Sequence, residues 1–202
     1  RVIGVDIDPR KVDLVESFGC IGIIGDEHHV ENILQNTKYF GADKVLLCAA
    51  TKSNKPIELV PEFTRQAGLL VVVGDVPMNI PRRSYYDKEI DIKVSRSYGP
   101  GRYDLAYEEG GIDYPYAYVR WTENRNMASG IDLLSRNKID VSKLISHRFK
   151  INQGLDAYKL LESPDDRLVL GLTIDYQDRK QIDDKKKHIR VNNKKVIMDN
   201  FD

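Results

Sequence analysis

The sequence predicts an α/β protein built on a doubly wound parallel sheet, and three observations support this prediction. Runs of Val, Ile and Leu recur at residues 1–8, 20–25, 44–51 and 69–77. They are apolar almost throughout, as strands covered on both faces are. Segments with the apolar spacing of helices separate them. This alternation of strands and helices is typical of a parallel sheet with helices on both faces.

The strand at residues 1–8 carries a carboxylate, Asp6, near its end. Asp8 is a good N-cap for the helix that follows, and Pro9 suits its first turn. In doubly wound folds, an acid at this strand end hydrogen-bonds the hydroxyls of an adenosine ribose. Asp6 is where that acid would lie, and its charge would repel a 2′-phosphate, which favours NAD over NADP. The alternative is an Asp that only forms the turn.

The next strands end in small or turn-forming residues. The strand at 44–51 precedes a helix that starts near Ser53 and is expected to end at Ala67 and Gly68, and the strand at 69–77 follows. Because ligands bind beyond the carboxyl ends of parallel strands, we expect one binding edge. The residues expected on it are Asp6, Ala49, Ala50, Thr51, Gly74, Asp75 and Val76.

The rest of the chain adds helices and short strands. In order, we expect an exposed edge strand at 89–97, a loop and tyrosine-rich insertion at 98–118, a helix at 123–137, a strand at 145–149, a helix at 152–163 carrying Leu155, Tyr158 and Leu161, and a strand at 168–174. We therefore expect a coenzyme-binding domain at 1–140 and a return segment at 141–176 that would pack on an absent catalytic domain. Residues 177–202 read as a charged linker or a small hairpin.

The composition excludes several classes of partner. The 31 basic and 31 acidic residues give a net charge of zero, so charge offers no argument for nucleic acid or a membrane surface. No apolar run approaches the ~18 residues of a membrane span. Cys20 and Cys48 lie in apolar runs and are expected to be buried thiols, which suits the reducing cytoplasm. Nothing has zinc-ligand spacing, and the adjacent His28 and His29 diverge on a helix.

Several stretches resemble the coenzyme-binding half of the medium-chain dehydrogenase/reductase family, the zinc-type alcohol and polyol dehydrogenases. The matching stretches are Val-Ile-Gly-Val-Asp at 2–6 with Lys11, Val-Val-Gly-Asp-Val-Pro at 72–77, Leu-Ile-Ser-His-Arg-Phe at 144–149, and the helix at 154–161. The resemblance covers residues 1–174. It implies that Asp6 binds the ribose with Lys11 beside it. It also implies that the backbones of 49–51 and 74–76 line the nicotinamide side.

Two further stretches are similar to a subgroup of bacterial two-part oxidoreductases. They are Ser-Arg-Ser-Tyr-Gly-Pro-Gly-Arg-Tyr-Asp at 95–104 and Tyr-Val-Arg-Trp-Thr-Glu-Asn-Arg at 118–125. In that subgroup a zinc-type dehydrogenase is joined to a sugar-oxidoreductase-like module, often linked with surface polysaccharide synthesis. The resemblance implies an NAD(H)-dependent oxidoreductase acting on a sugar-like or alcohol substrate. The family's first strand, glycine fingerprint, zinc ligands and proton relay are expected upstream of residue 1, so zinc belongs only to a full-length protein and no catalytic residue is assigned.

Substrate contacts are expected in the loop after the edge strand. Arg96 and Arg102 flank Gly-Pro-Gly, and Arg forks suit the phosphate of a phosphorylated or nucleotide sugar. The alternative is that these arginines only form a solvated surface. Tyr98 belongs to a group of tyrosines that is equally consistent with a surface on which a sugar stacks and with a subunit contact. The edge strand, residues 90–97, has one unpaired side, and its equivalent in the family pairs across a two-fold axis. We therefore expect a homodimer.

Two other classes fit parts of the sequence. Residues 2–51 also resemble the nucleotide-binding regulatory domains of potassium transport systems, in which the strand-end acid holds a ribose without chemistry. The stretch at 95–104 argues against that class. Asp6 would equally serve the ribose of S-adenosylmethionine in a methyltransferase. Those folds usually close with an antiparallel strand pair, which the helix at 123–137 disfavours.

Overall fold

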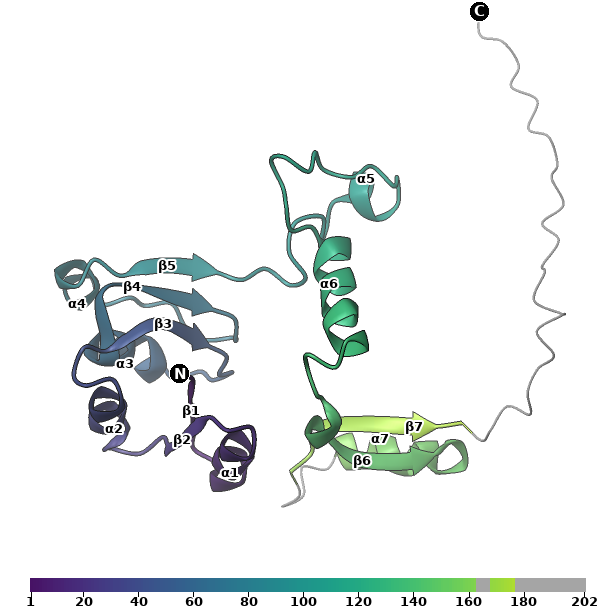
Figure 1. Ribbon diagram of the computed structural model, residues 1–202, viewed down its shortest axis with the longest axis horizontal. Coiled ribbons are helices and arrows are strands. Elements are labelled where there is room, and N and C mark those ends of the chain that lie inside the picture. Colours follow the sequence, from purple (N-terminus) through teal and green to yellow (C-terminus); the bar gives the residue numbers. More distant parts are fainter. Residues whose placement is uncertain (163–167, 177–202) are drawn as a thin grey trace, which may run out of the picture. The chain divides into compact units, whose positions relative to one another are not determined.

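The computed structural model describes residues 1–162 and 168–176. The chain divides into two compact units, Arg1–Asp140 and a second that begins at Val141 (Figure 1). The prediction of a charged linker or hairpin at 177–202 lies outside the described residues.

The first unit contains two parallel sheets. One has the order β1-β2, with β1 at Ile3–Asp6 and β2 at Ile21–Ile24. The other has the order β3-β4-β5, with bounds Ala42–Leu47, Thr64–Val72 and Asp91–Val94. This is the doubly wound α/β arrangement that the sequence predicts.

The strand order explains why there are two sheets. A doubly wound sheet has the spatial order 3-2-1-4-5-6, in which each number is the order of the strand in the sequence. Here β1 to β5 correspond to strands 2 to 6 of that order. Among the described residues nothing corresponds to strand 1, which would lie between β1 and β3. The glycine fingerprint belongs to the turn after that strand. The printed sequence likewise contains no such fingerprint.

Six helices belong to the first unit. They are α1 (Pro9–Ser17), α2 (His29–Asn36), α3 (Lys55–Phe63), α4 (Arg82–Asp87), α5 (Leu105–Glu108) and α6 (Glu123–Ser135). The predicted start and stop of α1 are confirmed. The Asp8 carboxylate accepts a hydrogen bond from the Arg10 amide at 3.0 Å, and Gly19 follows the helix with φ of 77°. The α2 helix contacts both β2 and α3.

The core of the first unit lies between α3 and β4. Ile57 and Val60 of α3 are buried with Leu70 of β4 and with Tyr85 of α4. The Tyr85 hydroxyl donates to the Ile57 carbonyl at 2.8 Å, and burial raises the pKa of Tyr85 to about 12. Tyr85 therefore stays neutral and ties α4 to α3.

The predicted end of α3 at Ala67 and Gly68 is wrong. The helix ends at Phe63, and the extended backbone of Thr64 begins β4. The Lys88 ammonium donates to the carbonyls of Pro61 and Thr64 at 2.5 and 2.8 Å, and the Thr64 hydroxyl donates to Val60 at 2.6 Å. These contacts satisfy carbonyl groups that the helix end leaves without intrahelical partners. The strands β3 and β4 also end earlier than predicted, so residues 48–51 and 73–77 form loops.

The second unit contains a parallel pair, β6 (Ile145–Lys150) and β7 (Gly171–Asp175), with α7 (Gly154–Glu162) between them in sequence. Short 3-10 turns lie at Ser142–Leu144 and Ile151–Gln153. The apolar residues predicted for α7 do not form its buried face. Ala157 and Leu160 are buried, whereas Leu155, Tyr158 and Leu161 are exposed. The small Ala157 side chain lets the helix backbone approach the sheet.

Candidate functional site

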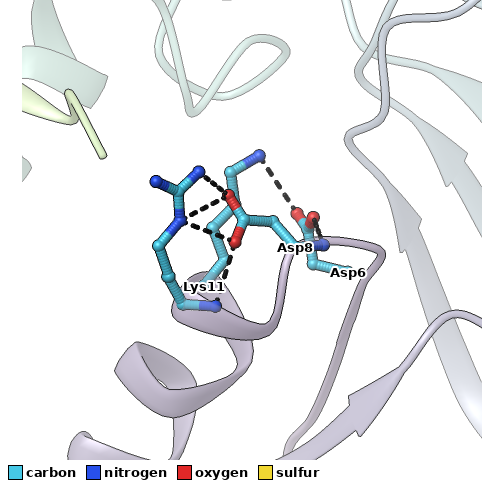
Figure 2. Close-up of polar contacts among 4 residues, drawn as sticks. Asp6, Asp8 and Lys11 are labelled. Atoms are coloured by element: carbon cyan, nitrogen blue, oxygen red, sulfur yellow. Dashed lines mark hydrogen bonds and ion pairs between the residues drawn. The ribbon is translucent and has the colours of Figure 1, made fainter. Parts of the chain in front are cut away.

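Asp6 ends β1, and its carboxylate is held on both oxygens (Figure 2). The Asp8 amide donates to Oδ1 at 3.0 Å, and the Lys11 ammonium lies 3.3 Å from Oδ2. The Asp6 side chain is 31% exposed and that of Lys11 is 45% exposed. The carboxylate is therefore fixed in direction but still accessible to a ligand, and each oxygen retains accepting capacity.

The turn that carries Asp6 also begins α1. Arg10 pairs with the Asp8 carboxylate through Nη2 at 2.7 Å, and hydrogen bonding to Arg10 lowers the pKa of Asp8. Asp8 is thus engaged in holding the turn. Among the described residues, the charged partner of Asp6 is the flexible ammonium of Lys11.

The loops after β3 and β4 are joined by backbone hydrogen bonds. The amides of Val73 and Gly74 both donate to the Leu47 carbonyl at 2.9 Å. The Thr51 amide donates to the Asp75 carbonyl at the same distance. The structure therefore brings the predicted residues Ala49 to Thr51 together with Gly74 to Val76, at the carboxyl ends of adjacent parallel strands.

Gly74 is required by the closeness of these loops. A Cβ built at this position would lie 2.0 Å from the Ala49 carbonyl oxygen and 2.7 Å from the carbonyl carbon. Both atoms are backbone, so neither is free to rotate away. The two loops therefore lie in direct backbone contact, and a site without a side chain at Gly74 suits the close approach of a ligand to the backbone.

Two places in the first unit are chemically suited to parts of a dinucleotide. Asp6 offers fixed acceptors for a ribose diol, and the joined loops offer backbone to a flat ring. Both follow the carboxyl ends of parallel strands, which is where ligands of this fold bind. Besides the predicted residues, sequence reasoning missed Asn54, whose side chain both accepts from and donates to the backbone of Asn79 at 3.2 and 2.9 Å. An Asn just before a helix is a local signal for such a contact.

The three predicted substrate residues lie in the segment after β5. Arg102 and Tyr98 are partners, with the guanidinium 5.8 Å from the ring centroid. Arg96 and Arg102 both lie over Tyr103, a residue that the prediction did not single out. Arg102 also pairs with Glu108, and the hydrogen bond to this carboxylate raises the pKa of Arg102.

A separate open groove of about 800 Å³ borders α4. Its lining includes Gln66 near the start of β4, and Glu89 and Ile90 just before β5. It lies at the amino ends of these strands, opposite the edge that carries the joined loops. We therefore do not assign it to the coenzyme.

The remaining features concern the two cysteines, metal ligands and membrane-spanning helices. The expectation that both cysteines are buried is wrong, because Cys48 is exposed and Cys20 is only partly buried. Cys48 follows the last residue of β3 and so leaves the sheet. In the described part of the chain, no group of three His, Cys, Asp or Glu side chains is arranged to hold a metal ion. None of the described helices has the length and apolar character needed to cross a bilayer.

Comparison with solved structures shows which known folds the chain resembles. A short-chain alcohol dehydrogenase from E. coli CFT073 complexed with NADH is 18% identical, with a TM-score of 0.61 over 85% of this chain and 43% of that one. Alcohol dehydrogenase TADH from Thermus sp. ATN1 is 17% identical, with a TM-score of 0.61 over 87% and 44%. An E. coli oxidoreductase of unknown specificity involved in membrane biogenesis is 18% identical, with a TM-score of 0.62 over 87% and 44%.

These likenesses show the fold. The chain spans less than half the length of each of the three structures. No protein-family model matches the chain, and no curated protein matches it in a sequence comparison.

Proposed function

We propose that the chain is the coenzyme-binding part of an NAD(H)-dependent dehydrogenase of the medium-chain dehydrogenase/reductase family. The observation that carries this proposal is the oriented, accessible Asp6 carboxylate at the end of β1. The similar fold of dehydrogenases, one of them complexed with NADH, supports it. When bound, the coenzyme supplies a hydride acceptor or donor.

The residues of this chain would position the coenzyme rather than carry out chemistry. Asp6 would accept hydrogen bonds from the two ribose hydroxyls, and Lys11 would steady the carboxylate from its other side. The negative charge of Asp6 disfavours the 2′-phosphate of NADP(H). The backbones of Ala49 to Thr51 and of Gly74 to Val76 would lie against the nicotinamide side. Hydride transfer belongs to the parent protein, and this chain alone is expected to be inactive.

A melting experiment on the full 202-residue chain tests coenzyme binding. We expect NADH to raise the melting temperature more than NADPH does, and S-adenosylmethionine to have no effect. A ligand at about 100 times its Kd stabilises the folded state by about 2.7 kcal/mol. A larger shift with NADPH would contradict the role of Asp6. A shift with S-adenosylmethionine alone would support a methyltransferase, although all the described strand pairs are parallel.

A regulatory nucleotide-binding domain would bind NADH as well, so an activity measurement must follow. We expect the intact parent protein to oxidise or reduce sugar-like hydroxyl or carbonyl carbons, with a change in the near-ultraviolet absorbance of NADH. NADH binding without any turnover across alcohols and sugars would favour the regulatory class. Zinc, if used, is proposed for the parent protein and not for this chain.

We assign the substrate side of the site to the segment after β5, with Arg96, Arg102 and Tyr98 as the predicted contacts. Tyr98 is more than half exposed. A sugar-like ligand suits aromatic rings that lie beside groups rich in hydrogen-bond donors. Two free cysteines support a reducing compartment, and we propose the cytoplasm.

We also propose a homodimer through β5, the edge strand within residues 90–97. In its sheet β5 pairs with β4 alone, and Val94 is 69% exposed. Pairing of two copies of this strand would satisfy the free backbone groups of both edges. We expect sedimentation of the chain at micromolar concentration to give the mass of a dimer. A proline at Ile92 should shift the equilibrium towards monomer, and monomer alone in the unsubstituted chain would contradict the proposal.

A further inference from the structure

Two guanidinium groups share one aromatic ring in the segment after β5. The Arg96 guanidinium lies 5.0 Å from the Tyr103 ring centroid, and that of Arg102 lies 4.3 Å from it. We call Arg96, Arg102 and Tyr103 the Tyr103 stack. A single ring attracts each cation, but the two like charges repel one another.

Only one of these charges is neutralised within the described part of the chain. Arg102 forms an ion pair with Glu108. Arg96 is exposed, and no carboxylate of the described residues lies within ion-pair distance of it. Asp104, next to Tyr103, accepts from the Tyr114 hydroxyl, a contact that lowers the pKa of Asp104. The Tyr103 stack and Glu108 together carry one net positive charge, on Arg96, while the carboxylate of Asp104 stays ionised in its hydrogen bond with Tyr114.

The loop that presents Arg96 is held in place. Ser97, Gly99, Gly101 and Tyr103 all have positive φ. The Pro100 carbonyl accepts from the Glu123 amide, and the Tyr98 carbonyl accepts from the Asn126 side chain, both at 2.8 Å. Gly101 packs against Tyr107, so a Cβ there would lie 2.7 Å from the ring. A fixed loop loses little conformational entropy when a ligand binds.

Arg96 also lies at the binding edge of the sheet. The Ser95 amide donates to the carbonyl of Val72, the last residue of β4, at 2.8 Å. Arg96 is the next residue after Ser95, and the loop that carries Gly74 begins at Val73. Arg96 therefore follows β5, which pairs with β4, and so lies at the carboxyl ends of the strands, as the loop after β4 does.

We propose that Arg96 binds the phosphate of a small phosphorylated sugar, with the sugar packed on the exposed rings of Tyr98 and Tyr103. A planar guanidinium already supported by a ring presents its N–H groups to phosphate with little loss of freedom. Both rings are more than half exposed. Arg102 is the weaker of the two guanidinium contacts, because Glu108 already engages its charge.

The surroundings favour a single anionic group over a polyanion. Apart from the carboxylates that pair with Arg102 and Arg125, the segment also carries Asp104 and Glu109, which would repel a nucleic acid backbone. A phosphorylated sugar would be the substrate class of the proposed dehydrogenase. Only its role as a substrate, and not its binding to Arg96, rests on the proposed function. Binding itself is measured without coenzyme, so the two proposals can fail separately.

Calorimetric titration of the full chain with glucose 1-phosphate tests the proposal. We expect binding that weakens as salt is added, because the contact is ionic and exposed. Arg96→Gln should weaken it about tenfold, the usual scale for loss of a charge-assisted hydrogen bond. Arg96→Lys keeps the charge but loses the planar fork, and it should recover only part of the affinity. The circular dichroism spectra of both variants should match that of the unsubstituted chain, because Arg96 is exposed.

The chain offers a matched control in Arg82→Gln. Arg82 is also an exposed guanidinium over a tyrosine, 5.1 Å from the Tyr86 centroid, but no second guanidinium of the described residues shares that ring. This change should alter the affinity by less than about twofold. If Arg82→Gln and Arg96→Gln reduce the affinity for glucose 1-phosphate equally, the ligand responds only to general charge attraction and the proposal is wrong. Equal affinity for inorganic phosphate, or for unphosphorylated glucose, would overturn the sugar-phosphate assignment.

Discussion

Gly74→Ala is expected to lower the free energy of unfolding by about 2–3 kcal/mol, at the upper end of what overpacking usually costs. The added methyl would lie 2.0 Å from the Ala49 carbonyl oxygen, and backbone atoms cannot move aside cheaply. The loops would have to separate, which would break the bonds from Val73 and Gly74 to Leu47. Urea denaturation followed by circular dichroism gives the change, and the stabilisation of the chain by NADH should disappear with it.

The control for this change is Gly130→Ala in α6. A Cβ at Gly130 meets nothing within 4 Å, and the residue lies inside a helix. Alanine there should raise stability by about 0.5–1 kcal/mol through helix propensity. The two variants should therefore change stability in opposite directions. Equal effects would mean that the contact between the loops of β3 and β4 does not require glycine.

Asp6→Asn is expected to weaken NADH binding by about 10–100-fold, because hydrogen bonds to a charged acceptor contribute about 1.5–3 kcal/mol. The fold should persist, since the amide oxygen of Asn is able to accept the bond that the Asp8 amide donates to Asp6. The preference for NADH over NADPH should fall at the same time, because the negative charge is lost. Titration of the variant with both coenzymes measures both effects.

Asp8→Asn is the matched control, since it removes the same charge two residues along the same turn. Asp8 is engaged with Arg10 and caps α1, and Asn is also a good N-cap. NADH affinity should change by less than about twofold. If the two variants lose affinity equally, the coenzyme responds to the overall charge of the turn, and the assignment of Asp6 to the ribose is incorrect.

The sequence predicted α1 well because its signals are local. Asp8, Pro9 and Gly19 each act on backbone groups within a few residues, and the structure has the cap and the positive φ where they were expected. Leu47 and Val72 also end neighbouring strands at one edge, since the carboxyl ends of paired parallel strands coincide, whereas Asp6 ends a strand of the other sheet.

Features that depend on distant residues were not predictable in this way. The end of α3 is set partly by Lys88, which lies 27 residues beyond Pro61 in sequence. The neutralisation of Arg102 by Glu108 requires the loop to fold back, and within the described residues it leaves Arg96 rather than Arg102 without a carboxylate partner. The buried face of α7 follows from the small Ala157, whereas apolar spacing alone favoured its larger neighbours.

The division between β1–β2 and β3–β5 has a consequence for the chain's internal dynamics. Among the described residues no hydrogen-bonded ladder joins the two sheets, whereas α2 and α3, which contact β2 and β4, also contact each other, including through the edge-to-face pair of His29 and Phe63. Neighbouring elements without a shared ladder tend to open as separate cooperative units. Amide protons of β1 and β2 should therefore exchange with solvent deuterium earlier than those of β4, which is hydrogen-bonded on both sides.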